Sequence, residues 1–140
     1  MSFPTPAADF RARVRYAECN AHGELALAGY VNFFGEAAAQ ALRRLDVDLR
    51  VLTARDGVLR ESACDVSIHR SPAYDEEVAV DVGLEALQDD GFSLHFALRP
   101  AHGADVLAMG WIRYEIRQRS GTPMRTMDAG LRDRIRQLKT

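Results

Sequence analysis

The sequence predicts an α+β domain in which one long helix lies across a curved antiparallel sheet of about five strands. Three observations predict this class: a strongly amphipathic segment at residues 30–45, alternating apolar and polar residues in several segments from residue 61 onward, and tight turns between those segments. A helix with a wide apolar stripe and a sheet with one apolar face bury each other. Because 140 residues match one ordinary domain, we expect a single domain spanning residues 1–140.

A strand and a loop are expected before the helix. Apolar residues alternate with arginines at Phe10, Ala12, Val14 and Tyr16. A period of two is typical of a strand with one solvent-exposed face. Residues 19–29 are punctuated by glycine and lack a regular pattern, so we expect a loop there.

The long helix is expected to start at Gly29, and Arg43 and Arg44 favour its C-terminal end through the helix dipole. Its apolar stripe at helical spacing comprises Tyr30, Phe33, Phe34, Ala37, Ala41, Leu42 and Leu45. The alanines of this segment suit the close approach of a neighbouring backbone. After it, the pattern is ambiguous: a short helical turn through Leu49 and Leu52, then a turn at residues 56–57.

From residue 61 onward the pattern predicts strands. Alternation indicates strands near residues 66–68, 77–84, 92–98 and 105–117, with turns at residues 71–72, 89–91 and 100–103. The last strand is apolar on both faces in its first half, at Val106, Leu107, Met109 and Trp111, so we expect both faces to be covered there. Residues 128–138 form a modest amphipathic helix.

Composition excludes several functional classes. A hydrophobic fraction of 47% fits a folded domain, and a net charge of -2 argues against nucleic acid as a partner. Two cysteines are too few for a disulfide scaffold. The first ten residues lack the features of a signal peptide, and no apolar run approaches the ~20 residues that cross a bilayer. We therefore expect a cytoplasmic protein that binds neither nucleic acid nor membrane.

Familiar catalytic signatures are absent from the sequence. There is no G-x-S-x-G elbow, no Gly-rich phosphate loop, no C-x-x-C and no H-E-x-x-H. The four histidines lie far apart without metal-ligand spacing: His22, His69, His95 and His102. The sequence therefore predicts no metal and no bound cofactor.

Two stretches carry the most informative pattern: VRYAECNAHG at residues 14–23 and GYVNFFGEA at residues 29–37. Together they resemble the signature of the 4-hydroxybenzoyl-CoA thioesterase-like branch of the hotdog fold. In that family a strand ends in a polar loop with a catalytic Asp, followed by a glycine, a tyrosine near the helix start and a Phe-x-Glu-Ala run. Residues 71–78 and 103–110 are also similar to the family, so the resemblance extends over most of the chain.

The resemblance implies a hotdog fold and the hydrolysis of an acyl-CoA thioester to a carboxylic acid and free coenzyme A. It also implies a homodimer or homotetramer with active sites between subunits, and coenzyme A enters as part of the substrate. Asn20 stands where the family has its catalytic Asp, and Leu27 where many members have a histidine. An amide cannot accept a proton or attack a thioester as a carboxylate can. The resemblance assigns the backbone N–H of Leu27 as the donor to the thioester oxygen, which no side-chain change removes.

Glu36 is the best substitute for the missing acid. A different hotdog branch, the arylacetyl-CoA and Arthrobacter-type thioesterases, places its catalytic carboxylate at about this helix position. Two questions stay open. Glu36 is either the acid or a structural carboxylate that pairs with an arginine or caps a loop. Asn20 either holds water or the substrate carbonyl or is simply a turn residue. Glu24, a loop carboxylate, ranks below Glu36.

Four further residues are candidates for substrate binding. His22 lies in a glycine-flanked loop, where it is either solvated or part of the site. Tyr30 and Phe33 belong first to the core, and Tyr30 is the better placed to reach an acyl pocket. Arg70 precedes a Ser-Pro turn, where it is either a surface charge or, as the resemblance implies, a ligand of the coenzyme A phosphates.

Two other functions compete with hydrolysis. The first is a non-catalytic acyl-CoA or acyl-carrier binding protein, in which Asn20 has replaced the catalytic acid. The second is a hotdog hydratase or dehydratase, which needs an Asp and His pair in a D-x-N-P-x-H loop. Residues 20–23, NAHG, lack the Asp and the proline, so this function ranks third.

Overall fold

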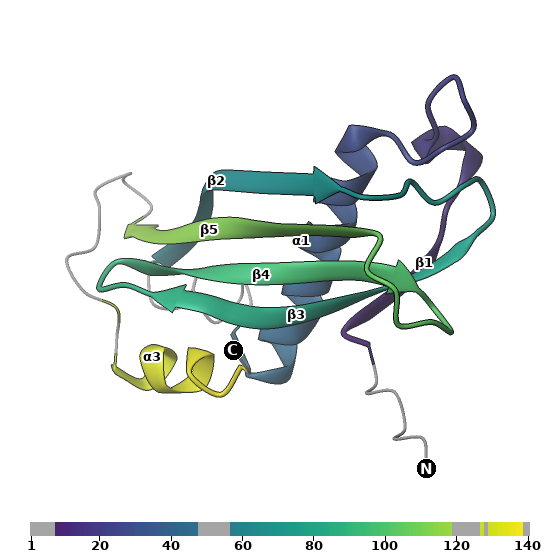
Figure 1. Ribbon diagram of the computed structural model, residues 1–140. Coiled ribbons are helices and arrows are strands. Elements are labelled where there is room, and N and C mark those ends of the chain that lie inside the picture. The colour runs from purple at the N-terminus through teal and green to yellow at the C-terminus, as the bar shows by residue number, and fades with distance from the viewer. Residues whose placement is uncertain (1–7, 48–56, 119–126, 128, 139–140) are drawn as a thin grey trace, which may run out of the picture.

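The computed structural model describes residues 8–47, 57–118, 127 and 129–138. One long helix, α1 (Leu27–Arg44), lies across a curled, five-stranded antiparallel sheet, as the sequence predicts (Figure 1). No helix of the described part of the chain is long and apolar enough to cross a membrane.

The strand order is β1-β3-β4-β5-β2, and every neighbouring pair is antiparallel. The strands are β1 (Phe10–Arg13), β2 (Gly57–Ile68), β3 (Glu77–Leu87), β4 (Gly91–Pro100) and β5 (Ala108–Gln118). The turns expected at residues 89–91 and 100–103 connect β3 to β4 and β4 to β5. β2 therefore lies at one end of the sheet, and the much shorter β1 lies at the other.

The first strand is shorter than its alternation predicts. It ends at Arg13, and the chain turns into a 3-10 helix, η1 (Tyr16–Glu18). The turn closes because the Glu18 carboxylate accepts hydrogen bonds from the backbone N–H of Arg15 at 2.9 Å and from its Nε at 3.3 Å. Tyr16, expected on the apolar face of a strand, is instead 82% exposed.

α1 begins at Leu27, two residues before the expected start at Gly29, and its apolar stripe is buried as predicted, except that Leu45 is half-buried. The ring of Phe34 stacks on Phe96 of β4 with centroids 4.9 Å apart and planes 9° apart. Three alanines of the helix, Ala37, Ala38 and Ala41, are buried in the core of the same chain. These three alanines therefore pack within their own chain and are not available to a partner chain.

The expectation that both faces of the last strand are covered fails for the single chain. Leu107 and Ile112 are buried in the core, but Met109 and Trp111 point away from α1 and are 51% and 37% exposed. The strand begins at Ala108, later than predicted, and it is not an edge because β2 pairs with it.

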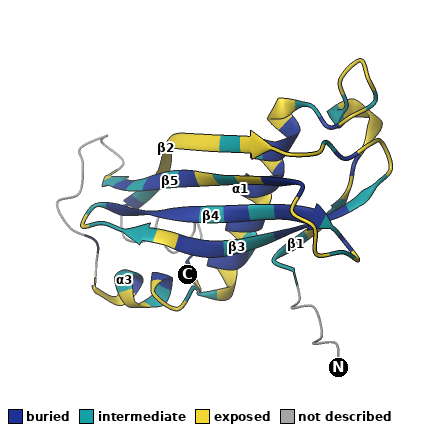
Figure 2. Ribbon diagram, viewed as in Figure 1, coloured by how far each residue is buried: buried dark blue, intermediate teal, exposed yellow. Residues whose placement is uncertain are grey.

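The remaining elements fit the sequence prediction in part. α3 (Ala129–Ile135) buries Leu131 and Ile135, as the amphipathic pattern predicts. β2 starts at Gly57, before the predicted strand region. The turns expected near Leu49 and Leu52 and at Asp56 lie outside the described residues. Burial is concentrated in β3, β4, β5 and the inner side of α1, whereas most of β2 is exposed (Figure 2).

Substitutions of two glycines by alanine test how closely α1 packs on the sheet. A Cβ at Gly110 would meet Phe34 Cε2 at 2.8 Å and would also clash with the carbonyl oxygen of Asp65. A Cβ at Gly35, on the helix, would meet nothing within 4 Å. We expect Gly110→Ala to lower the free energy of unfolding by about 1–3 kcal/mol because of overpacking. Gly35→Ala should raise it by about 0.5–1 kcal/mol because alanine restricts the unfolded chain.

Urea unfolding followed by circular dichroism measures both effects. The two substitutions add the same methyl group, so they control for each other. Equal effects of the two variants would contradict the close approach of Phe34 to Gly110.

Candidate active site

The N-terminal end of α1 has unsatisfied backbone donors. Its N-cap is Ala26, which supplies no side-chain hydrogen bond. Within the described part of the chain, the N–H groups of Leu27 and Ala28 have no hydrogen-bond acceptor. The side chain of Leu27 is 63% exposed. Free N–H groups at the positive end of an 18-residue helix can stabilise negative charge on a ligand.

Asn20 shapes the loop that leads into this helix end. Its Oδ1 accepts hydrogen bonds from the backbone N–H of His22 at 2.9 Å and of Glu24 at 3.3 Å. Gly23 completes the turn with a positive φ of 74°, which glycine adopts without strain. The Asn20 oxygen is therefore engaged in holding a turn, which is one of the two roles expected for it.

A second loop, at residues 69–76, docks on the first. The N–H of Leu25 donates to Pro72 O and that of Tyr74 to Gly23 O, both at 2.9 Å. This docking brings Tyr74 against Tyr16 of η1, and the rings meet edge to face at 87° with centroids 6.2 Å apart. Tyr74 is 56% exposed, so the two loops hold a pair of solvent-accessible aromatic rings.

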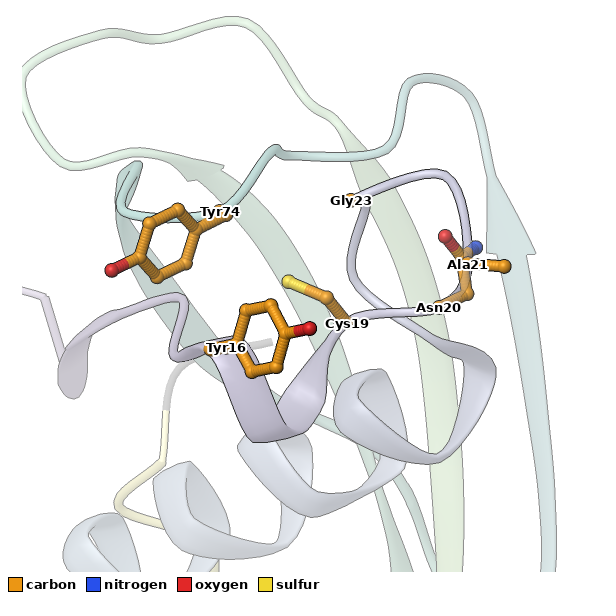
Figure 3. Close-up of a pocket in the computed structure, with 6 residues that line it drawn as sticks. All are labelled: Tyr16, Cys19, Asn20, Ala21, Gly23 and Tyr74. Atoms are coloured by element: carbon orange, nitrogen blue, oxygen red, sulfur yellow. The ribbon is translucent and has the colours of Figure 1, made fainter.

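A groove of about 470 Å³ lies between these rings and the Asn20 turn (Figure 3). The sulfur of Cys19 points toward the two rings, and it donates a hydrogen bond to Arg15 O at 3.4 Å. The residues that line the groove are Tyr16, Cys19, Asn20, Ala21, Gly23 and Tyr74. None of these lining side chains is a carboxylate or an imidazole, so the groove itself contributes no strong base.

Glu36 lies in a different groove, of about 330 Å³, together with Phe33, Asn32 and Glu18. Phe33 is buried there, and its ring centroid is 5.9 Å from that of Phe10. The structural alternative for Glu36 requires either an arginine partner or a loop that the carboxylate caps. Within the described residues Glu36 makes no ion pair or hydrogen bond, whereas Arg15, which lines the same groove, pairs with Glu18 at 3.3 Å.

The free N–H groups and Glu36 do not form one site in a single chain. Leu27 and Glu36 are nine positions apart on α1, which corresponds to about 13–14 Å along the helix axis. A thioester whose oxygen accepts a hydrogen bond from Leu27 N–H is therefore out of reach of Glu36 in the same chain.

Tyr30 is fully buried in the first turns of α1. Its hydroxyl faces Ser71, but within the described part of the chain it has no partner in hydrogen-bond geometry. Burial raises the pKa of Tyr30, and the nearby Glu24 carboxylate raises it further. The hydroxyl is therefore a neutral, unsatisfied donor beneath the second loop, and Tyr30 does not line either groove.

The other two expected binding residues lie at the surface. His22 is exposed at the tip of the first loop. Arg70 is exposed and pairs with Glu76 at 3.2 Å. Such an exposed ion pair is worth little and can exchange for another anion.

No protein-family model matches this chain, and no curated protein does. Solved structures do match. The chain is similar to a 1,4-dihydroxy-2-naphthoyl-CoA thioesterase from Synechocystis (TM-score 0.81, 13% identity, covering 92% of this chain and 95% of that one). It is similar to a dynemicin thioesterase (TM-score 0.82, 20% identity, covering 94% and 96%) and to a gentisyl-coenzyme A thioesterase (TM-score 0.78, 15% identity, covering 91% and 98%). The fold is the hotdog fold.

Sequence reasoning did not identify three side chains at the helix end of this hotdog domain: Tyr16, Cys19 and Tyr74. Tyr16 follows the alternation of the strand, and nothing local shows that the chain leaves the sheet before it. Tyr74 lies far from Tyr16 in the sequence, so only the docking of the two loops makes them neighbours. The one available signal was the tyrosine in the loop that follows Ser71-Pro72.

The role of Asn20 in the turn can be measured as stability. Asn20→Ala removes the acceptor of two backbone N–H groups and should lower the free energy of unfolding by about 0.5–1.5 kcal/mol. Asn20→Asp keeps an acceptor in the same place and should lie within about 0.5 kcal/mol of wild type. Urea unfolding at neutral pH compares them, and an unchanged stability of Asn20→Ala would show that the oxygen does not hold the turn.

Proposed function

We propose that this protein is a cytoplasmic thioesterase that hydrolyses an acyl-CoA thioester to a carboxylic acid and free coenzyme A. The observation that carries the proposal is the uncapped N-terminus of α1, whose Leu27 and Ala28 N–H groups have no acceptor among the described residues. The three thioesterases with the same fold support the reaction class. The resemblance of residues 14–37 to the 4-hydroxybenzoyl-CoA thioesterase-like branch is part of the same proposal.

The free donors fit the hardest step of the reaction. When water attacks the thioester carbon, the carbonyl oxygen gains negative charge before the carbon–sulfur bond breaks. The N–H of Leu27, aided by the helix dipole, donates to that oxygen. A backbone donor does not depend on the side chain, so a leucine at this position keeps the function.

Glu36 is the proposed base. It takes a proton from the attacking water and returns it to the departing coenzyme A sulfur, so that no proton is gained or lost. Glu36 is free of ion pairs within the described residues, as a proton acceptor should be. Because Leu27 of the same chain is about 13–14 Å away along α1, Glu36 acts on a substrate held by a second copy. The proposal therefore includes a homodimer or homotetramer.

The remaining candidates contact the two ends of the substrate. Arg70 binds a coenzyme A phosphate by exchanging its exposed partner, Glu76. Phe33, which shares a groove with Glu36, contacts the acyl group. His22, exposed in the same loop as Asn20, donates to the substrate. The unsatisfied Tyr30 hydroxyl lies beneath the second loop, outside both grooves, and contributes to the substrate site from behind that loop.

A substitution of Glu36 tests the proposed base. Glu36→Gln keeps the size of the side chain but removes its basicity, and it should lower kcat by at least ~10²-fold, the usual scale for a lost acid–base group. KM and the oligomeric state should be unchanged. Glu24→Gln is the matched control, because it neutralises another exposed carboxylate close to the Asn20 turn and should leave kcat within about threefold of wild type.

The kinetics are measured with short, branched, aromatic and long acyl-CoA substrates and a thiol-detecting dye. Loss of activity in Glu24→Gln together with retention in Glu36→Gln would reverse the assignment of the base. Equal retention in both would make Glu36 a structural residue.

One observation favours a second function, the binding of acyl-CoA or an acyl carrier without hydrolysis. The groove beside the helix end is lined by no carboxylate or imidazole, and the Asn20 oxygen already holds the turn. Asn20→Asp separates the two functions. Under hydrolysis by Glu36, Asn20→Asp should be neutral or mildly harmful, because two nearby carboxylates repel. Under the binding function, wild type is inactive on the whole substrate panel, and Asn20→Asp creates hydrolysis.

A further inference from the structure

A third groove, of about 270 Å³, lies between α1 and β2. Its walls come from three elements: Val31 of α1, Ile112 of β5 and residues 61–64 of β2. Ile112 is buried in the core, whereas residues 61–64 are exposed, so the groove has an apolar floor and an accessible β2 side (Figure 2). None of the residues assigned so far lies in this groove.

The groove begins one helical turn from the free donors of α1. Val31 follows Leu27 by four positions, which corresponds to about 6 Å along the helix axis, and residues at this spacing lie on the same side of a helix. In the proposed function the thioester oxygen accepts a hydrogen bond from the Leu27 N–H. An acyl group that extends from this carbonyl along α1 therefore reaches Val31 and the groove beside it.

A β-bulge turns a carboxylate of β2 toward the groove. The register between β2 and β5 shifts between Glu61 and Ala63, so that Glu61 lies opposite Tyr114 and Cys64 lies opposite Ile112. Tyr114 and Ile112 are buried, and residues directly opposite in a sheet share a face. Glu61 and Cys64 therefore both face inward although they are three positions apart, which a regular strand does not allow.

Glu61 and Tyr114 form a polar pair beside the groove. The Glu61 carboxylate makes no ion pair or hydrogen bond within the described part of the chain. The Tyr114 ring stacks on Phe92 with centroids 5.3 Å apart, and its hydroxyl makes no hydrogen bond to any described residue. Burial raises the pKa of Tyr114, and the nearby Glu61 charge raises it further, so the hydroxyl stays a neutral donor.

The pair discriminates between possible ends of an acyl group. An alkyl end placed against Glu61 removes water from the carboxylate without replacing its hydrogen bonds, which costs free energy. A terminal carboxylate is repelled by the like charge of Glu61. A terminal hydroxyl replaces the lost water on both sides, because it donates to Glu61 and accepts from Tyr114.

We infer that Glu61 is a specificity-determining residue, which together with Tyr114 selects acyl groups that end in an uncharged hydrogen-bond donor such as a hydroxyl or a primary amide. The inference rests on the proposed function for the position of the thioester at Leu27. In that function Glu36 and Phe33 belong to the other copy, so this groove is left to the far end of the acyl group.

Binding of thioether analogues tests the inference without hydrolysis. The analogues are linear acyl-CoA mimics of increasing length, each with an unmodified, a hydroxyl or a carboxylate end, and isothermal titration calorimetry gives their Kd values. At the best length, wild type should bind the hydroxyl form at least ~10-fold more tightly than the other two, the scale of a hydrogen bond to a charged group. Equal Kd values for the three forms at every length would overturn the inference.

Substitutions assign the preference to the polar pair. Glu61→Gln keeps the size of the side chain but removes its charge, so binding of the carboxylate form should improve by ~10-fold or more. Tyr114→Phe keeps the ring on Phe92 and should weaken binding of the hydroxyl form alone. Glu85→Gln is the matched control, because Glu85 is exposed beside Trp111 in a groove on the other face of the sheet, and it should leave the preference unchanged.

The native Cys64 reports where the acyl end lies. Because Cys64 is exposed in the same groove, saturation with the hydroxyl analogue should slow its alkylation by iodoacetamide, measured by peptide mass spectrometry. An unchanged alkylation rate would overturn the placement of the acyl end, and so would a wild-type preference for the hydroxyl form in Glu61→Gln. A wild type that shows the preference and the protection but hydrolyses no acyl-CoA would support this inference and contradict only the proposed hydrolysis.

Discussion

The contact of Phe34 with Phe96 over Gly110 fixes where the helix lies on the sheet. A side chain at position 110 would push the Phe34 ring away. The helix packs this closely on the sheet because Gly110 has no side chain. The arrangement turns the buried alanines toward the core and leaves the opposite side of α1, with Glu36, in solvent. The exposed position of the candidate base follows from it.

A set of backbone hydrogen bonds positions the other half of the site. The two loops at the helix end are joined through Leu25 and Tyr74, and the Asn20 side chain closes the turn within the first loop. These bonds keep Ala26 in extended conformation before the helix, without a capping side chain. The free N–H groups of the first turn are therefore a property of the local fold and are independent of the side chain at Leu27.

The distance between the Leu27 N–H donor and the Glu36 carboxylate connects the proposed chemistry with the proposed homo-oligomer. A rigid helix cannot bring its first residue and Glu36 together, so a site that uses both needs two copies.

Periodicity along the chain determined the elements of this protein. The stripe on α1 and the alternation in β3 and β4 predicted a helix across an antiparallel sheet, because these patterns report burial locally. The sequence also located the Asn20 loop and Glu36. Only the tertiary structure showed that Tyr16 lies outside the sheet and that the ring of Tyr74 contacts the ring of Tyr16. It also showed that Glu36 and Leu27 lie too far apart on α1 to share a site in one chain. It also showed that β5 lies inside the sheet and that β1 and β2 are its two end strands. Each of these facts depends on contacts between residues distant in sequence or on the length of a helix in space. Neither long-range contacts nor helix length can be read from the local pattern of apolar and polar residues.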